Sequence, residues 1–303
     1  MLSPRSLARY AWISVAAALA TIGLKVWAWW VTGSVGLLSD AIESLVNLAA
    51  ALVALWMLAL AERPPDEAHA HGYSKAEYFS SGFEGAMILL AAGAIIWTAA
   101  PRLVAPAALE QVGFGLAISI LASLVNLGVS RLLLRAARQH RSITLEADAR
   151  HLMTDVWTSA GVVLGVVLVT LTGWQRLDPL IAIAVGGNIL WTGYTLLRRS
   201  ALGLLDPSLD LARLGAIHGV LDRFRAQGIG FHALRTREAA GRSFVSVHVL
   251  VPGDWTVQAG HDLLERIEGE IRSAVPGCSV ITHLEPLEDP LSLADEALDR
   301  NTD

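Results

Sequence analysis

The chain has few of the residues on which many soluble enzymes and secreted proteins depend. It contains one cysteine, Cys278, so an intrachain disulfide and a cysteine metal cluster are excluded. Charged residues make up 17% of its 303 residues, whereas a soluble domain usually carries about a quarter. No nucleophile elbow, phosphate-binding loop or HExxH motif occurs in the sequence. The C-terminal part also lacks the basic cluster that nucleic-acid binding requires, so nucleic acid is not an expected partner.

Hydrophobic residues are abundant instead, at 53% of the chain, and most of them fall in six long runs. A helix needs about 20 apolar residues to cross a bilayer, and each run is long enough. The predicted spans cover residues 9–31, 34–60, 77–101, 111–135, 144–171 and 177–197. The first run is too long for a cleavable signal. We therefore expect an α-helical membrane protein in which six transmembrane helices occupy residues 1–206.

Positive charges are unevenly distributed between these spans. With the N-terminus inside, two basic residues, Arg102 and Arg176, fall on the outer side and ten on the inner side. The inner set is Arg5, Arg9, Arg63, Lys75, Arg131, Arg135, Arg138, Arg141, Arg198 and Arg199. Because Lys and Arg accumulate on the cytoplasmic side of membrane proteins, both termini are expected in the cytoplasm. The expected location is the cell (inner) membrane.

Residues 207–290 have the pattern of a small cytoplasmic α/β domain. Residues 211–224 and 263–271 keep helical spacing of apolar side chains, and residues 245–251 alternate valine with other residues, as a half-buried strand does. Residues 231–237 and 278–284 are expected to be two further strands. The predicted order is α-β-β-α-β in two layers, followed by a flexible acidic tail over residues 291–303.

Two of the predicted spans carry the same polar pattern, at positions i, i+3 and i+7. These residues are Asp40, Glu43 and Asn47 in the second span and Asp148, His151 and Asp155 in the fifth. Positions with this spacing share one face of a helix. An ionisable group in a membrane costs roughly 2.5–3.5 kcal/mol on insertion scales, so it needs a partner or a wet cavity.

A divalent cation is the simplest partner for these two polar stripes. Glu43 and Asp155 supply carboxylates, Asn47 an amide oxygen and His151 an imidazole, which together make four ligands. The alternative is an interhelical hydrogen-bond network that only holds the bundle together, and this is the expected role of a lone residue such as Asn126. Two helices with the same polar pattern and three or more acids favour a bound ion over such a network. Asp40 and Asp148 are candidates for groups around the ligands or on the route to them.

The chain resembles the cation diffusion facilitators, which are proton-coupled exporters of zinc and related divalent ions. The resemblance covers nearly the whole chain and rests on motifs in both halves. These are Ser39-Asp40-Ala41, Asp148-Ala149-Arg150-His151 followed by Asp155, His69 with Lys75-Ala76-Glu77, and Phe231-His232-Ala233-Leu234-Arg235-Thr236-Arg237. It implies a homodimer in the lipid bilayer that exchanges metal ions for protons and is not an enzyme.

The resemblance also implies where metal ions bind. The family's transport site falls on Glu43, Asn47, His151 and Asp155. Zinc members usually offer His or Asp at the first position and Asp at the second, so this set is richer in oxygen and carries less charge at the second position. Zinc favours nitrogen and sulfur, whereas manganese accepts carboxylate and carbonyl oxygen. The metal therefore stays open among zinc, iron(II) and manganese(II).

Two further sets follow from the same resemblance. The loop between the second and third spans has Asp66 and His69 at family positions, with Tyr73 in place of the second family His and His71 nearby. A solvated polar loop is the alternative there. In the tail, the positions that bind ions in the family hold His232, His248, His261, His283 and Glu285, the last in place of the usual Asp.

Lys75 and Asp206 match positions that form a charge interlock between protomers in the family. The alternative is a surface pair that contributes well under about 1 kcal/mol to stability.

Two other functions also remain open for the whole chain. The first is a membrane-anchored metal sensor whose cytoplasmic domain binds metal, and the second is a membrane enzyme that uses metal-assisted hydrolysis, which would need an open coordination position.

Overall fold

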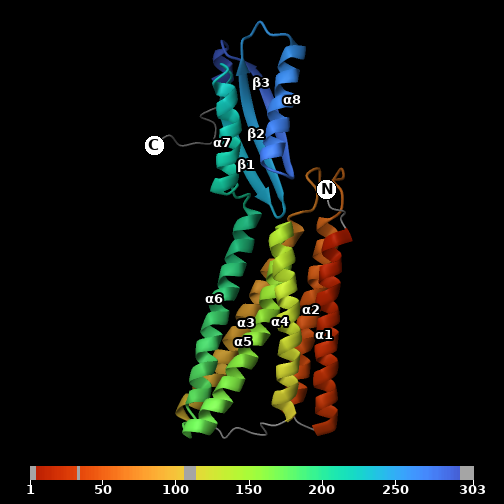
Figure 1. The fold of residues 1–303 in the computed structure, drawn as a ribbon, viewed down its shortest axis with the longest axis vertical. Helices are drawn as coiled ribbons and strands as arrows, with labels where there is room; N and C mark the ends of the chain where they lie inside the picture. Colours follow the sequence, from red (N-terminus) through yellow and green to blue (C-terminus); the bar gives the residue numbers. More distant parts are fainter. Residues whose placement is uncertain (1–4, 33–34, 106–113, 294–303) are drawn as a thin grey trace. The chain divides into compact units, whose positions relative to one another are not determined.

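The computed structural model describes residues 5–32, 35–105 and 114–293, and the chain divides into two compact units, Met1–Leu202 and Gly203–Asp303. Six helices make up the first unit and lie where the sequence predicts the six spans (Figure 1). They are α1 (Arg5–Thr32), α2 (Val35–Ala61), α3 (Ala76–Val104), α4 (Phe114–His140), α5 (Ile143–Thr172) and α6 (Leu177–Leu204). The prediction of a helical transmembrane domain is confirmed.

The helices have the length and the surface of membrane spans. Each has between 27 and 30 residues, which gives roughly 40 Å at 1.5 Å per residue. Five of them are apolar enough to cross a membrane within the described residues, and the described apolar part of α2 is shorter, Leu48–Ala61. Trp30, Trp97 and Trp191 are 78%, 81% and 67% exposed. Many large apolar side chains on the outside of a helical bundle favour contact with lipid over contact with water.

Small residues let the transmembrane helices approach closely. A Cβ atom at Gly161 of α5 would lie 3.0 Å from Val185 of α6, and one at Gly165 would lie 2.8 Å from Asp178. On the other side of α6, a Cβ atom at Gly193 would lie 2.9 Å from Leu89 of α3. Packing of this kind holds membrane helices together where the hydrophobic effect cannot. It places α6 in contact with both α3 and α5.

The second unit has the predicted order of elements, so the α-β-β-α-β prediction is confirmed. It contains α7 (Leu211–Arg225), β1 (Gly230–Ala239), β2 (Arg242–Val251), α8 (Val257–Ala274), β3 (Cys278–Pro286) and a 3-10 turn, η1 (Pro290–Leu293). β1 pairs antiparallel with β2, and β2 pairs parallel with β3. A parallel pair needs a long crossover connection, which α8 provides. Residues 291–293 of the expected tail lie in η1, and the rest of the tail, from 294 onward, lies outside the described residues.

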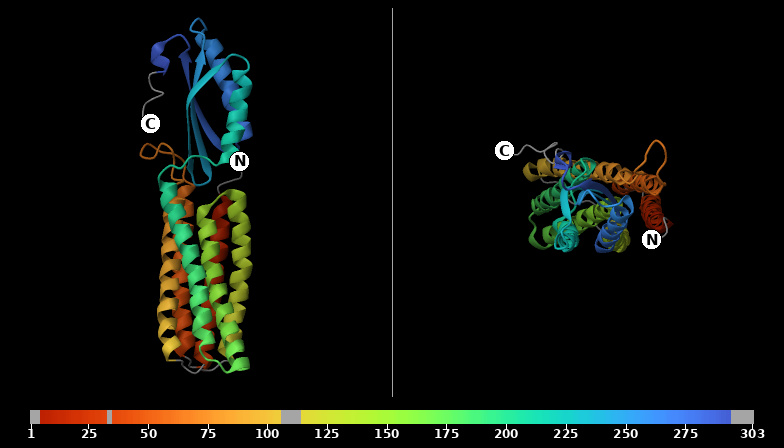
Figure 2. Two further views of the ribbon diagram at one scale, coloured as in Figure 1. Left: turned by 90° about the vertical axis from the view of Figure 1, so that its left-hand side faces the viewer. Right: turned by 90° about the horizontal axis from the view of Figure 1, so that it is seen from above.

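One face of the three-stranded sheet is covered by α7 and α8 (Figure 2). The valines of β2 at 245, 247, 249 and 251 are buried there against Leu263, Ile267 and Ile271 of α8. Because side chains alternate along a strand, Ser246 and His248 point to the other face. The hydrophobic core thus fixes which side of the sheet presents the histidines.

Candidate metal centres

The first candidate centre lies on α5, where His151 and Asp155 are one helical turn apart and share a face. The side chain of His151 is buried, at 6% exposure, and Asp155 is half-buried. The side chains of Glu43, Asn47 and Asp40 on α2 lie outside the described residues, so only the α5 half of the predicted ligand set is seen. That half offers one imidazole and one carboxylate from neighbouring turns.

Asn126 of α4 contacts the carboxylate of this centre. Its side-chain amide donates a hydrogen bond of 3.1 Å to Asp155 Oδ2. Asn126 is buried, and its Oδ1 atom makes no hydrogen bond in the described structure. The predicted role of Asn126 as a bridge between helices is confirmed, but the sequence does not predict that its partner is Asp155. A lone Asn in a span carries no signal that distinguishes these two cases.

A second buried acid on α5, Asp148, is held by α1. Ser14 donates a hydrogen bond of 2.8 Å to Asp148 Oδ1, and Asp148 is only 2% exposed. Near the opposite end of α1, Lys25 donates a hydrogen bond of 2.9 Å from Nζ to Ser44 of α2. α1 therefore supplies polar contacts to both helices that carry the polar stripes.

Glu84 of α3 is a buried acid that the sequence analysis missed. It is fully buried, and neither carboxylate oxygen has a hydrogen-bond partner in the described structure. Its signal was visible, because it is an acid inside an otherwise apolar span, which is the criterion applied to the second and fifth spans.

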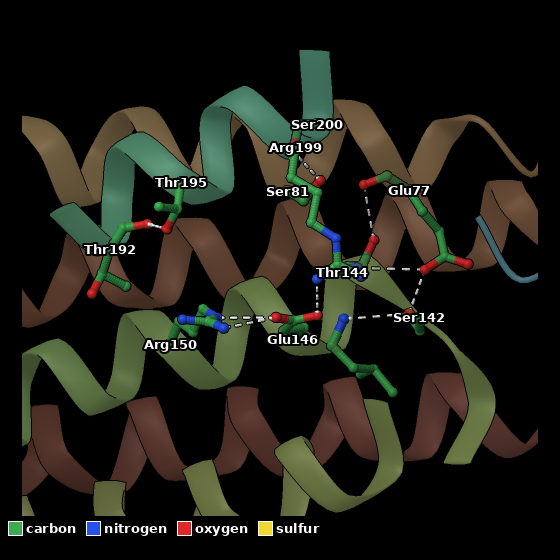
Figure 3. Close-up of polar contacts among 11 residues, drawn as sticks. Glu77, Ser81, Ser142, Thr144, Glu146, Arg150, Thr192, Thr195, Arg199 and Ser200 are labelled. Carbon is green, nitrogen blue, oxygen red and sulfur yellow. Dashed lines mark hydrogen bonds and ion pairs between the residues drawn. The ribbon is translucent and has the colours of Figure 1, made fainter. Parts of the chain in front are cut away.

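A polar network joins the ends of α3, α5 and α6 (Figure 3). Ser142, the N-cap of α5, donates a hydrogen bond to the Glu77 carboxylate, and the backbone N–H of Thr144 donates to the same oxygen at 3.4 Å. Glu77 therefore satisfies donors at the start of α5 that would otherwise lack partners.

Glu146 forms the second half of this network. It accepts hydrogen bonds from Arg150, one turn along α5, and a hydrogen bond of 2.6 Å from Arg199 of α6. Between α3 and α6, the hydroxyls of Ser81 and Ser200 lie 2.6 Å apart. These contacts and the glycine packing tie α3, α5 and α6 into one group of helices.

The loop after α2 brings Asp66 and His69 together. The His69 backbone N–H donates to Asp66 Oδ1 at 2.7 Å, and His69 Nδ1 lies 3.6 Å from the same oxygen. Tyr73 donates a hydrogen bond of 2.6 Å to Asp66 Oδ2, and this bond holds the pKa of Asp66 below its ordinary value. His71, the third residue of the predicted loop site, is exposed. Tyr73, in place of the family's His, thus occupies an oxygen that an ion would need.

A second candidate centre lies on the open face of the sheet in the second unit. The register pairs His232 with His248 across β1 and β2, and His248 with His283 across β2 and β3. Glu285 Oε2 lies 2.6 Å from His232 Nε2, and Glu285 Oε1 lies 3.2 Å from His248 Nδ1 and 3.5 Å from His283 Nε2. One carboxylate therefore contacts three imidazoles.

This second centre has the spacing of a metal site. One ligand atom from each of His232, His248 and Glu285 lies within 4.8 Å of the others. Imidazole and carboxylate suit zinc and its neighbours, so the donors fit a divalent ion. His261, on the first turn of α8, is exposed, and no described contact joins it to the cluster.

Lys75 and Asp206 fall in different units and are described separately. Lys75 is half-buried at the N-cap position of α3. Asp206 accepts a hydrogen bond of 3.2 Å from Arg237 within the second unit. The interlock between protomers therefore stays a prediction.

Comparison with known proteins gives consistent matches over both units. A model of the cation efflux transmembrane domain matches residues 11–205, and a model of the cation efflux protein cytoplasmic domain matches residues 209–287. The chain is 56% identical to a Synechocystis protein described as the uncharacterized transporter sll1263, over 93% of this chain and 91% of that one. It is 28% identical to the cation-efflux pump FieF of Salmonella arizonae, over 93% of each.

Among solved structures, the metal-bound C-terminal domain of the CzcD transporter from Thermotoga maritima is 27% identical, with a TM-score of 0.25. The match covers 26% of this chain and 93% of that one. Because the two family models together match most of the chain, and a relative of 56% identity matches along nearly its whole length, the family is established. The chain belongs to the cation diffusion facilitator family and is an integral membrane transporter of divalent metal cations, not an enzyme.

Proposed function

We propose that the protein exports a divalent cation from the cytoplasm in exchange for protons. His151 and Asp155 bind the ion from α5, together with Glu43 and Asn47 from α2. The observation that carries this proposal is the pair of metal-ligating groups inside the bundle, one turn apart, with Asn126 oriented onto Asp155. A polar pair of this kind within a membrane is costly unless it serves a function.

Competition between metal ions and protons accounts for the exchange. An ion binds only when the imidazole is neutral and the carboxylates are ionised, so protons and metal exclude each other at the same atoms. In an alternating-access cycle, the site loads from the cytoplasm, opens outward and releases the ion as protons enter. His151 is the proposed proton carrier because the same imidazole nitrogen binds either a metal ion or a proton.

The ligand set favours no single metal among zinc, iron(II) and manganese(II). The oxygen donors of Glu43, Asn47 and Asp155 suit iron(II) and manganese(II), while His151 also suits zinc. A competition panel on the reconstituted protein tests the contribution of Asn47. If Asn47→Asp moves the preference toward zinc, Asn47 is a selectivity residue, and an unchanged order of metals rules out that role.

The protein is proposed to lie in the cell (inner) membrane with both termini in the cytoplasm. Its second unit is proposed to be a cytoplasmic domain for regulation and dimerisation. Its open sheet face gathers His232, His248, His283 and Glu285 for a regulatory ion. The family model that matches this unit is that of a cytoplasmic domain. The Lys75–Asp206 interlock between the protomers of a homodimer belongs to the same proposal.

Transport in reconstituted vesicles with an imposed pH gradient tests the export function. Asp155→Ala is expected to abolish metal uptake into vesicles, because it removes a charged ligand, while Asn188→Ala serves as the control. Asn188 is also a polar residue in a span, but it is exposed on α6. If Asp155→Ala transports metal as well as the wild type, the assignment of this site is wrong.

A membrane-anchored metal sensor is the second candidate function, and the clustered ligands on β1, β2 and β3 favour it. The two functions predict opposite results for two variants. A sensor loses its metal response in His248→Ala and keeps it in Asp155→Ala. A transporter loses metal flux in Asp155→Ala and keeps a basal flux in His248→Ala.

A further inference from the structure

Glu84 lies on α3 and Asp148 on α5, two helices that contact each other, and neither residue is among the predicted transport ligands. Glu84 is fully buried and Asp148 is 2% exposed. The carboxyl group of Asp148 is close enough to act electrostatically on Glu84. Two carboxyl groups in such a place repel each other unless something neutralises at least one of them.

Most of the carboxylate oxygens of Glu84 and Asp148 have no hydrogen-bond partner in the described structure. Ser14 donates to Asp148 Oδ1, but Asp148 Oδ2 and both oxygens of Glu84 have no partner in the described structure. Ser80 lies one turn before Glu84 on the same face of α3, and its fully buried hydroxyl also has no partner there. Native proteins satisfy nearly all buried polar atoms, so four unsatisfied oxygens indicate a missing partner.

The number of oxygens decides between a shared proton and a bound cation. One proton joins two oxygens and would leave a third carboxylate oxygen and the Ser80 hydroxyl without partners. A hard cation takes about six oxygen ligands, so it can contact several of these oxygens at once, and it also neutralises the charge. The described contacts of Glu84 and Asp148 include no Lys or Arg that could neutralise them instead.

We propose that Glu84 and Asp148, with the Ser80 hydroxyl, form a second cation site inside the transmembrane unit. All its donors are oxygens, so it takes a hard divalent cation such as manganese(II). Ser14 acts as a positioning residue that fixes the Asp148 carboxylate. This site differs from the predicted transport site in two ways. It includes residues of α3, Glu84 and Ser80, and it has no nitrogen donor. It does not depend on proton exchange.

Manganese(II) binding to the purified full-length protein tests this site, with electron paramagnetic resonance as the readout. The background for the test carries Asp155→Ala and His248→Ala, which removes ligands of both other centres. In this background we expect Glu84→Gln and Asp148→Asn each to lose one bound manganese(II) ion per chain. Glu146→Gln is the matched control, because Glu146 lies on α5 near Asp148 but already faces Arg150 and Arg199. It is expected to keep the ion.

Two results with the carboxylate variants would overturn the proposal. One is a background protein that binds no more manganese(II) than its Glu84→Gln variant, as a pair that only shares a proton would give. The other is a loss of the ion in Glu146→Gln as well. If Glu84→Gln and Asp148→Asn do not fold, Ser80→Ala should still lower the affinity several-fold, and an unchanged affinity contradicts the site. Because Asp155 is absent from the background, failure of the export function leaves this result unaffected.

Discussion

At the scale of single residues, Asn126 is the residue whose expected role the structure changes most. A hydrogen bond to a charged carboxylate orients that group as well as stabilising it. Groups that orient metal ligands typically contribute 10–100-fold to metal affinity. We therefore expect Asn126 to position Asp155 for metal binding, in addition to forming the observed bridge between α4 and α5.

The Asn126→Ala variant is expected to weaken the apparent metal affinity of transport about tenfold, with a smaller change in the maximal rate. The measurement is the metal dependence of flux in vesicles. Ser130→Ala is the matched control, because Ser130 also bridges α4 to α5 but donates to the backbone oxygen of Ala149. Equal effects of the two substitutions would mean that Asn126 serves packing alone.

Cys278, at the start of β3, provides a natural probe because the chain has no other cysteine. Its side chain is buried, and burial raises the pKa of its thiol above the ordinary value. Because the thiolate is the reactive form, alkylation of the native protein is expected to be much slower than that of the denatured protein at pH 8. The native rate should rise as the pH increases toward the raised pKa. Mass spectrometry at several pH values measures both rates, and equal rates would contradict burial.

The sequence predicted some of these residues and not others for physical reasons. His151 and Asp155 were visible because charged groups are rare in apolar spans, and the same criterion should have found Glu84. The contact of Tyr73 with Asp66 depends on how the loop folds back. Neither composition nor spacing predicts that contact.

At the scale of elements, apolar patterns were sufficient to predict the six helices and the order of the tail. Length and apolarity decide a span almost alone, because backbone polar groups must be satisfied internally in lipid. The alternating valines of β2 likewise predicted which face of the sheet is buried. The pairing order of the strands was not predicted, because it depends on the crossover made by α8.

The cap of α7 offers a test of how the second unit is stabilised. Asp210 accepts a hydrogen bond of 2.9 Å from the Arg213 backbone N–H, and that bond keeps the pKa of Asp210 below its ordinary value. Loss of such a cap costs about 1 kcal/mol. We expect Asp210→Ala to speed alkylation of Cys278 about fivefold where local opening limits the reaction.

Asp210→Ser, which keeps a capping oxygen, is the control and should stay close to the wild-type rate. A lowered pKa means that the contribution of Asp210 is present above its unfolded pKa and is lost as the pH falls through its folded value. The difference between Asp210→Ala and the wild type should therefore shrink in acid. A difference that grows in acid would exclude this cap as the cause.

At the scale of the whole molecule, the polar contacts divide the transmembrane unit unevenly. α3, α5 and α6 share the Glu77–Ser142 and Glu146–Arg199 contacts, while Ser14 and Asn126 reach α5 from α1 and α4. The bonds from α1 and α4 end on acids of the polar stripe, at Asp148 and Asp155. Because the proposed ions bind these same acids, the two bonds connect the proposed sites to α1 and α4, which is one way in which binding can be coupled to a rearrangement of the bundle.

The distribution of basic residues predicts how the whole molecule is oriented in the membrane, with both termini in the cytoplasm. In a Cys278→Ser background, Arg63→Cys and Arg102→Cys place single thiols at exposed positions on opposite sides. A membrane-impermeant maleimide is expected to label Arg102→Cys in intact cells and to label Arg63→Cys only after the membrane is permeabilised. The reverse pattern would place the N-terminus outside. The second unit, with its histidine cluster, would then face away from the cytoplasmic metal that it is proposed to bind, so this experiment also tests the regulatory role of that unit.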